Sequence, residues 1–173
     1  MEQNKIGILV PAFNEANNLK YLIPKLKKLG DLLIVNDGST DETQILLKSN
    51  YCNYISIKRN SGYENTVITG LKYFKKKNVD YVITFDADRQ HKINEIKKIK
   101  KMISYSNIDL YIFNRKKKNR FSEYILDFIF QKKYNIKDPL SGLKVFSQNS
   151  LQEINLNNIK KKFLVDLSYV YFI

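Results

Sequence analysis

The sequence predicts an α/β domain with a mostly parallel central sheet and helices on both faces. Short apolar runs alternate about six times with longer segments of helical periodicity, which is the pattern of parallel strands joined by helical crossovers. The clearest run, residues 81–85, is apolar and rich in β-branched residues, as expected of a strand buried on both faces. Acidic residues follow it directly, at the rim where open α/β sheets bind their ligands.

The first half of the chain predicts two strand–helix units. The opening strand is the apolar run IGILV, which Pro11 is expected to end because proline has no N–H for a sheet ladder. The helix after it carries leucines at helical spacing, and Asn14 is placed to cap it. A second apolar run, 32–35, leads through the turn 36–41 to another helix, whose N-cap is expected within that turn.

The second half keeps this alternation and then changes. Residues 54–57 predict a strand before a helix over 63–77, and the apolar run at 81–85 precedes an amphipathic helix over 92–103. A further strand is expected over 108–113. The helix predicted over 121–134 is apolar around much of its circumference and is flanked by lysines. It is either a core helix packed on the sheet or a helix lying in an anionic membrane interface.

Two carboxylates, Asp86 and Asp88, follow the central strand. The chain can curl at a strand end, so both side chains can face one hard cation such as Mg²⁺ or Mn²⁺, which in turn binds a diphosphate. A solvated turn is the alternative interpretation of this pair taken alone.

The charge is +13 and lies mostly in the second half. Residues 1–86 carry 12 basic and 9 acidic residues, whereas residues 87–173 carry 18 and 8. A basic half predicts an anionic partner, namely a phosphate-bearing substrate, an anionic membrane or nucleic acid; biased codon usage is the alternative source of the lysines. Arg89, Arg115 and Arg120 fall in or just after the expected site, where a planar guanidinium suits phosphate oxygens.

Composition also bears on the compartment. The single cysteine, Cys52, allows no internal disulfide. The first residues show no signal-peptide pattern, and no apolar run reaches the roughly 20 residues that span a bilayer. We therefore expect a cytoplasmic protein, peripheral on the inner face of the cell membrane.

Five segments resemble, in order, the family 2 glycosyltransferases of GT-A fold. They are VPAFNEANNL (10–19), IVNDGSTDET (34–43), RNSGYENTVITGL (59–71), TFDADRQH (84–91) and FNR (113–115). A sixth, DPLSGLKVF (138–146), is similar to the Asp-x-x-Ser-Gly-Phe-Arg segment of the polyprenyl-phosphate sugar transferases, the dolichyl-phosphate mannose synthase-like branch. The resemblance covers about residues 5–147. Tyr63 and Glu64 depart from it, because small or basic residues usually follow Gly62 there.

The resemblance implies roles for particular residues. Those expected to bind the nucleotide sugar are Pro11, Ala12, Asn14, Glu15, Asp37 and Asp86. Those expected to hold Mg²⁺ or Mn²⁺ are Asp86, Asp88 and Gln90. The expected catalytic residues are Asp88, Arg115 and Arg120, and those expected at an acceptor phosphate are Arg115, Arg120, Ser141 and Lys144. His91 is expected behind these ligands or at a helix start.

The implied activity is an inverting, metal-dependent transfer of a hexosyl group from a nucleotide-diphosphate donor to polyprenyl phosphate. One alternative keeps the fold but uses a saccharide hydroxyl as acceptor, which requires a general base. Another is a non-catalytic basic module that binds nucleic acid or a membrane surface, although no nucleic-acid-binding motif is present and no nucleic-acid partner is expected. We expect one domain over 1–173, with a nucleotide-sugar part (1–115) and an acceptor-side part (116–173).

Overall fold

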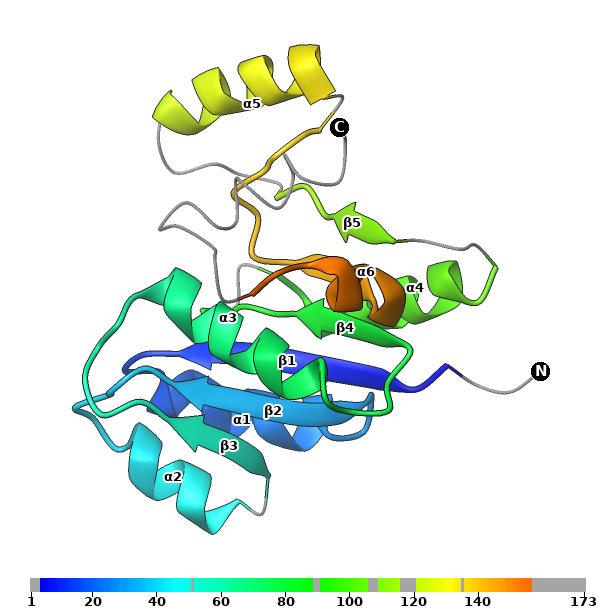
Figure 1. The fold of residues 1–173 in the computed structure, drawn as a ribbon. Coiled ribbons are helices and arrows are strands. Elements are labelled where there is room, and N and C mark those ends of the chain that lie inside the picture. Colours follow the sequence, from blue (N-terminus) through cyan, green and yellow to red (C-terminus); the bar gives the residue numbers. More distant parts are fainter. Residues whose placement is uncertain are drawn as a thin grey trace.

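The strands of the protein form one sheet with the order β3-β2-β1-β4-β6-β5 (Figure 1). The computed structural model describes residues 4–50, 52–88, 91–105, 109–115, 121–134 and 136–156. The strands are β1 (Ile6–Ala12), β2 (Asp31–Asn36), β3 (Asn53–Ser56), β4 (Tyr81–Thr84), β5 (Leu110–Ile112) and β6 (Lys144–Ser147). The helices are α1 (Ala16–Leu26), α2 (Thr43–Ser49), α3 (Tyr63–Phe74), α4 (Ile93–Ile103), α5 (Phe121–Tyr134) and α6 (Gln148–Glu153).

The sheet is mostly parallel, which confirms the predicted fold class. β1 pairs in parallel with both β2 and β4, and β2 pairs in parallel with β3. β6 is antiparallel to β4 and to β5, and it was not among the predicted strands. Its pairing of Lys144 with Thr84 brings the segment 138–143 beside the carboxyl end of β4.

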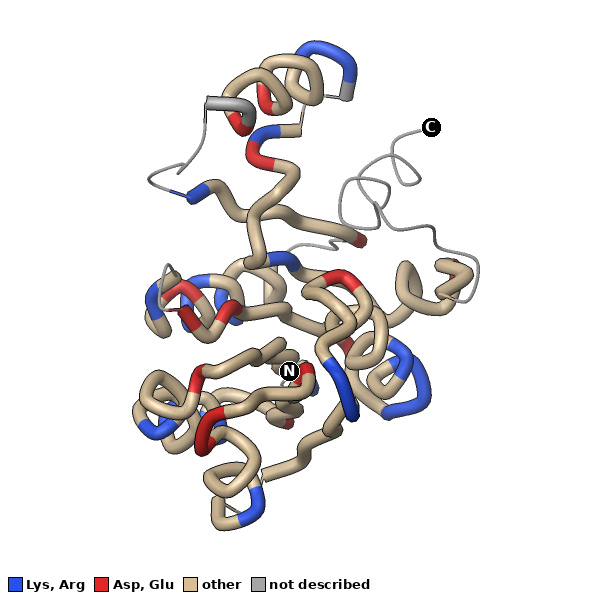
Figure 2. The backbone as a smooth tube through the Cα atoms, turned by 90° about the vertical axis from the view of Figure 1, so that its left-hand side faces the viewer, with Lys and Arg blue, Asp and Glu red and all other residues tan. Residues whose placement is uncertain are grey.

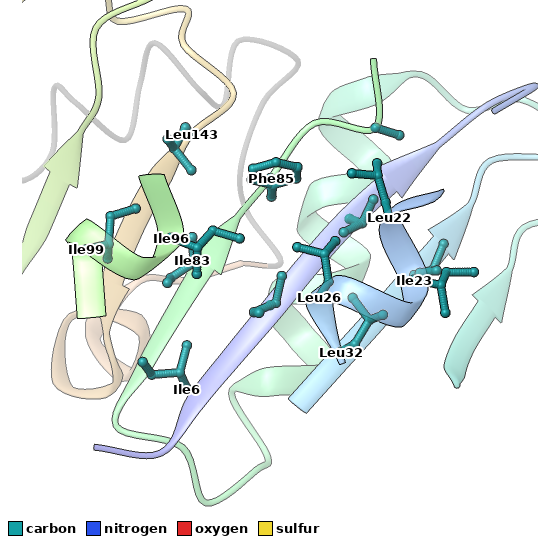
Figure 3. Close-up of a cluster of buried hydrophobic side chains, with 14 of the residues drawn as sticks. Ile6, Leu22, Ile23, Leu26, Leu32, Ile83, Phe85, Ile96, Ile99 and Leu143 are labelled. Atoms are coloured by element: carbon teal, nitrogen blue, oxygen red, sulfur yellow. The ribbon is translucent and has the colours of Figure 1, made fainter. Parts of the chain in front are cut away.

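Helices cover both faces of the sheet, and each face has its own apolar cluster. Helices α1 and α4 pack on one face, where Leu22, Ile96 and Phe85 are buried (Figure 3). Helices α3 and α6 pack on the other face, where Leu9 of β1 and Leu151 of α6 are buried. β1 is buried along its whole length, as the alternation of its side chains between two covered faces requires.

The structure corrects two expected element ends. Pro11 lies inside β1 rather than ending it, because the pairing with β4 stops at Leu9 and the proline nitrogen needs no ladder partner beyond that point. Helix α2 has Glu42 at its N-cap, outside the turn 36–41 in which the cap was expected.

Helix α5 has the predicted bounds and lies apart from the helices that cover the sheet (Figure 1). Tyr124, Ile125, Phe128 and Ile129 are 49–68% exposed on it, whereas Phe130 is buried. The alternative of a core helix packed on the sheet is therefore wrong for these four exposed side chains. In the part of the chain that the structure describes, no helix is both long enough and apolar enough to cross a membrane.

Candidate active site

A cavity of about 470 Å³ opens at the carboxyl ends of β1, β2 and β4. Figure 2 shows the molecule from this edge, where acidic and basic segments lie near one another. The order of the strands reverses between β1 and β4, and such a switch point is where open α/β sheets bind ligands. The predicted site residues that line the cavity are Pro11, Ala12, Glu15, Asp37, Asp86, Asp88 and Arg115.

Asp37 is buried at the end of β2 and is bonded on both carboxylate oxygens. Oδ1 accepts hydrogen bonds from the backbone N–H and the hydroxyl of Ser61, both at 2.8 Å, and Oδ2 accepts one from the N–H of Gly62 at 2.9 Å. Gly62 has a φ of 93°, a conformation that favours glycine. Asp37 therefore fixes the loop before α3 as well as lining the cavity.

Asn14 does not cap α1, whose N-cap is Glu15. Its Oδ1 accepts from the backbone N–H groups of Thr40 and Asp41, at 2.8 and 3.3 Å, and its own N–H donates to Ser39 Oγ. The side chain thus ties the loop after β1 to the turn after β2, and Asn14 is not among the residues that line the cavity. Asn14 was expected to accept hydrogen bonds from backbone N–H groups, and it does, but its bonding partners lie some 25 residues away along the chain.

Other side chains take over the start of α1. Asp41 Oδ2 accepts from the N–H of Ala16 at 3.2 Å, and Thr43 Oγ1 accepts from the N–H of Glu15 at 3.1 Å. The bonds that Asp41 accepts from Thr43 and Ala16 lower the pKa of its carboxyl group, although burial opposes them. The acidic turn therefore holds the first helix in place beside the cavity.

Asp86 is held from two sides. The Tyr63 hydroxyl donates to Oδ1 at 2.6 Å. A Cβ atom on Gly142 would lie 1.8 Å from Oδ2, so only glycine leaves room for the carboxylate. Burial raises the pKa of Asp86 above its usual value; the Tyr63 hydrogen bond opposes the rise and the charge of Asp88 adds to it.

Asp86 and Asp88 suit a hard divalent cation. Both line the same cavity, and their mutual repulsion is what such an ion would relieve. The described residues contain no group of three or more His, Cys, Asp or Glu side chains arranged to hold a metal. Mg²⁺ is usually bound by one or two carboxylates, and substrate phosphates and waters complete its coordination shell. The residues present therefore fit the ion. Gln90, the third predicted ligand, lies outside the described residues.

Arg115 lines the cavity within a network of buried carboxylates. Its Nε and Nη2 bond Asp138, with 2.8 Å between Nη2 and Oδ1, and Nη2 also lies 2.8 Å from Oε2 of Glu123 on α5. Its backbone N–H donates to Asp138 Oδ2 at 2.7 Å. The bonds to Asp138 raise the pKa of Arg115, and burial opposes this rise. One guanidinium thus links the cavity, the segment 138–143 and α5.

Ser141 and Lys144 lie behind the cavity rather than on its surface. Both are buried, and Lys144 Nζ donates to the carbonyl of Pro139 at 2.9 Å. Burial lowers the pKa of Lys144 to about 7, although Asp86 and Asp138 oppose the shift. Ser141 Oγ lies 3.4 Å from His91 Nε2, and this histidine also bonds Glu95. Contact of Ser141 and Lys144 with an acceptor phosphate stays a prediction, and Arg120 lies outside the described residues.

Three side chains that shape the site, Tyr63, Asp138 and Glu123, had no predicted role. Tyr63 was visible only as a departure from the family pattern, and Asp138 only as the first letter of a motif. Glu123 gave no signal, because nothing in a single helix indicates an ion pair with a strand-end arginine. Each of them acts across a long sequence separation or through a loop.

The fold is GT-A, the fold of nucleotide-diphospho-sugar transferases. A crystal structure of glucosyl-3-phosphoglycerate synthase from Mycobacterium tuberculosis, in complex with Mn²⁺, UDP-glucose and phosphoglyceric acid, matches with a TM-score of 0.65 at 21% identity. The match covers 84% of this chain and 57% of that one. Residues 7–154 match the family "Glycosyl transferase family 2", and the chain belongs to this family.

Relatives in this family include proteins named for lipid-linked sugar transfer. MJ1222 of Methanocaldococcus jannaschii, an uncharacterized protein, is 30% identical over 89% of this chain and 69% of its own length. The UDP-N-acetylglucosamine–dolichyl-phosphate N-acetylglucosaminyltransferase of Methanococcus voltae is 27% identical over 90% and 74%. The dolichol-phosphate mannosyltransferase of Pyrococcus furiosus is 24% identical over 94% and 52%. The chain thus spans about half the length of the last relative and of the matching crystal structure.

Proposed function

We propose that this protein is an inverting, metal-dependent glycosyltransferase that moves a hexosyl group from a nucleotide-diphosphate sugar to polyprenyl phosphate at the cytoplasmic membrane face. The observation that carries the proposal is the cavity itself, because Asp37, Asp86, Asp88 and Arg115 line one space at the carboxyl ends of the strands. The names of the dolichyl-phosphate and dolichol-phosphate relatives support the choice of acceptor.

Different residues of the cavity bind different parts of the donor. Pro11, Ala12, Glu15 and Asp37 line the part of the cavity formed by the ends of β1 and β2, where we place the nucleoside. Asp86 and Asp88 would hold Mg²⁺ or Mn²⁺, which when bound supplies the positive charge that a leaving diphosphate needs. Asp86 is half-buried, which limits the access of water to the side of the ion that it would hold.

The acceptor phosphate requires orientation more than deprotonation. Its oxygen is already ionised near neutral pH, so it attacks the anomeric carbon as the bond from that carbon to the diphosphate breaks on the opposite side, which inverts the configuration. Arg115 places a fixed positive charge at the cavity, and its pairing with Asp138 holds the guanidinium plane in position. Its Nη1 group takes part in neither carboxylate bond, and we assign it to the acceptor phosphate.

The second half of the chain forms the acceptor side in this proposal. Helix α5 exposes Tyr124, Ile125, Phe128 and Ile129, and Lys132 and Lys133 lie in its last turn. A helix of this kind lies in a membrane interface, with its apolar side chains among acyl chains and its lysines at anionic headgroups. The Glu123–Arg115 ion pair joins this helix to the cavity, so a lipid phosphate could reach the donor while its chain stays in the bilayer.

The test is transfer from labelled UDP- and GDP-sugars, with and without Mn²⁺, to polyprenyl phosphate or to saccharide acceptors. We expect a product that partitions into organic solvent and whose formation requires Mn²⁺. A water-soluble product would favour a saccharide hydroxyl as acceptor, for which Asp88, an exposed carboxylate at the cavity, is a candidate base. No transfer from any donor, with no donor raising the melting temperature, would refute the proposal.

A further inference from the structure

Residues 61–63 connect the two acid-bearing strand ends of the cavity. Ser61 and Gly62 donate three hydrogen bonds to Asp37 at the end of β2. The next residue, Tyr63, begins α3 and donates its hydroxyl to Asp86, beyond the end of β4. One short segment therefore sets the position of both carboxylates relative to each other.

The contact between Tyr63 and Asp86 is short and well supported. The donor–acceptor distance is 2.6 Å, which is typical of a charge-assisted bond between a hydroxyl and a carboxylate. The tyrosine is fixed to the first turn of α3, which packs on the sheet through buried side chains such as Val67 and Leu71. On its other side the Asp86 carboxylate meets the backbone of Gly142, so it has little freedom to turn away.

We infer that Tyr63 is a positioning residue that holds the Asp86 carboxylate in the orientation that binds the divalent ion. The inference rests on the proposed function, because it assumes that Asp86 is a metal ligand. The hydrogen bond and ligation are compatible, since each carboxylate oxygen can accept more than one bond and Oδ2 receives none from Tyr63. Tyr63 stands at a position where the family resemblance leads us to expect a small or basic residue.

The test is direct titration of the full chain with Mn²⁺, with and without UDP. Binding is monitored as the loss of the EPR signal of free Mn²⁺. In Tyr63→Phe the ring remains and only the hydroxyl is lost. We expect its Mn²⁺ dissociation constant to rise about tenfold or more, which is the usual effect of removing a group that orients a metal ligand. Tyr105→Phe is the matched control, because Tyr105 is 79% exposed and does not line the cavity; we expect it to bind Mn²⁺ as the parent does.

The outcomes separate this inference from the proposed function. If the parent binds Mn²⁺ and Tyr63→Phe binds it equally well, the positioning role is wrong while the proposed function stands. The role is also wrong if the loss of binding only follows the loss of folded protein in a thermal melt. If the parent binds no Mn²⁺ with or without UDP, the metal site fails and both are overturned.

Discussion

Gly142→Ala tests how closely the segment 138–143 holds the acidic site. The added methyl carbon would lie 1.8 Å from Oδ2 of Asp86 and 2.2 Å from its Cγ, well inside ordinary contact distance. The φ angle of Gly142 is not in the left-handed region, so the perturbation comes from the side-chain clash rather than from backbone strain. Because β6 anchors this segment to β4, we expect the Asp86 side chain to yield.

The magnitude follows from what Asp86 must give up. Forcing an extra methyl group into a packed region costs about 1–3 kcal/mol. Turning Asp86 away also breaks the 2.6 Å bond from Tyr63, and a hydrogen bond to a charged group contributes about 1.5–3 kcal/mol. The two costs are alternatives, because the methyl group is either accommodated with Asp86 in place or makes Asp86 turn away, so we expect the free energy of unfolding to fall by about 1–3 kcal/mol.

The effect on function should be comparable in free energy to the effect on stability, because a 100-fold change in rate corresponds to about 2.7 kcal/mol. Displacing a reacting group by about 1 Å can reduce the rate about 100-fold, and we expect a loss of that size in sugar transfer. Urea unfolding, Mn²⁺ titration and transfer from labelled donor measure the three effects, with Lys137→Ala as an exposed control in the same region. Parent-like stability, Mn²⁺ affinity and transfer in Gly142→Ala would refute the assigned geometry.

Three further predictions address other parts of the molecule. Asp138→Asn weakens the pairing with Arg115, while Glu123 still compensates the guanidinium charge, and we expect urea unfolding to show a loss of about 1.5–3 kcal/mol; parent-like stability would contradict the pairing. Phe128→Glu on α5 should weaken co-sedimentation with anionic vesicles, whereas Ile45→Glu, equally exposed on α2, should not; equal losses would exclude α5 as the contact. The pKa of Lys144 is lowered from 10.5 to about 7, so between these two pH values the unfolded state binds more protons than the folded state. The free energy of unfolding should therefore rise with pH over this range, and Lys144→Met should flatten the rise. An unchanged slope in Lys144→Met would refute the shifted pKa of this lysine.

The order of the elements was predictable because it depends on local periodicity. The runs at 6–10, 32–35 and 81–85 became β1, β2 and β4 with ends shifted by one or two residues. The convergence of the acids was predictable too, since parallel strands place their carboxyl ends at one edge. Strand β6 was not predicted, because its residues were interpreted only as part of the family motif 138–146. Its position between β4 and β5 depends on pairing with strands that are distant in the sequence.

The finer structure of the site could not be predicted, for the same physical reason. The fragment Asp138-Pro-Leu-Ser-Gly reads as a turn, and its sequence does not reveal that Asp138 bonds Arg115 or that Gly142 leaves room for Asp86. Asn14 was correctly chosen as a side chain that accepts backbone N–H bonds, but the local rule supplied the wrong partner. Side-chain geometry between distant segments is determined by packing, which one sequence does not display.

The site is built by bonds among its own loops, and this bears on its chemistry. Asp37 is held by residues 61–62, Asp86 lies between Tyr63 and Gly142, and Arg115 is fixed by Asp138. A ligand entering such a cavity meets charges already in position, so little of its binding free energy is spent on ordering the protein. The same bonds make the site sensitive to small changes, because each clamp fixes a charged group. Substitutions that add or remove a few atoms at these positions should therefore reduce transfer as well as stability.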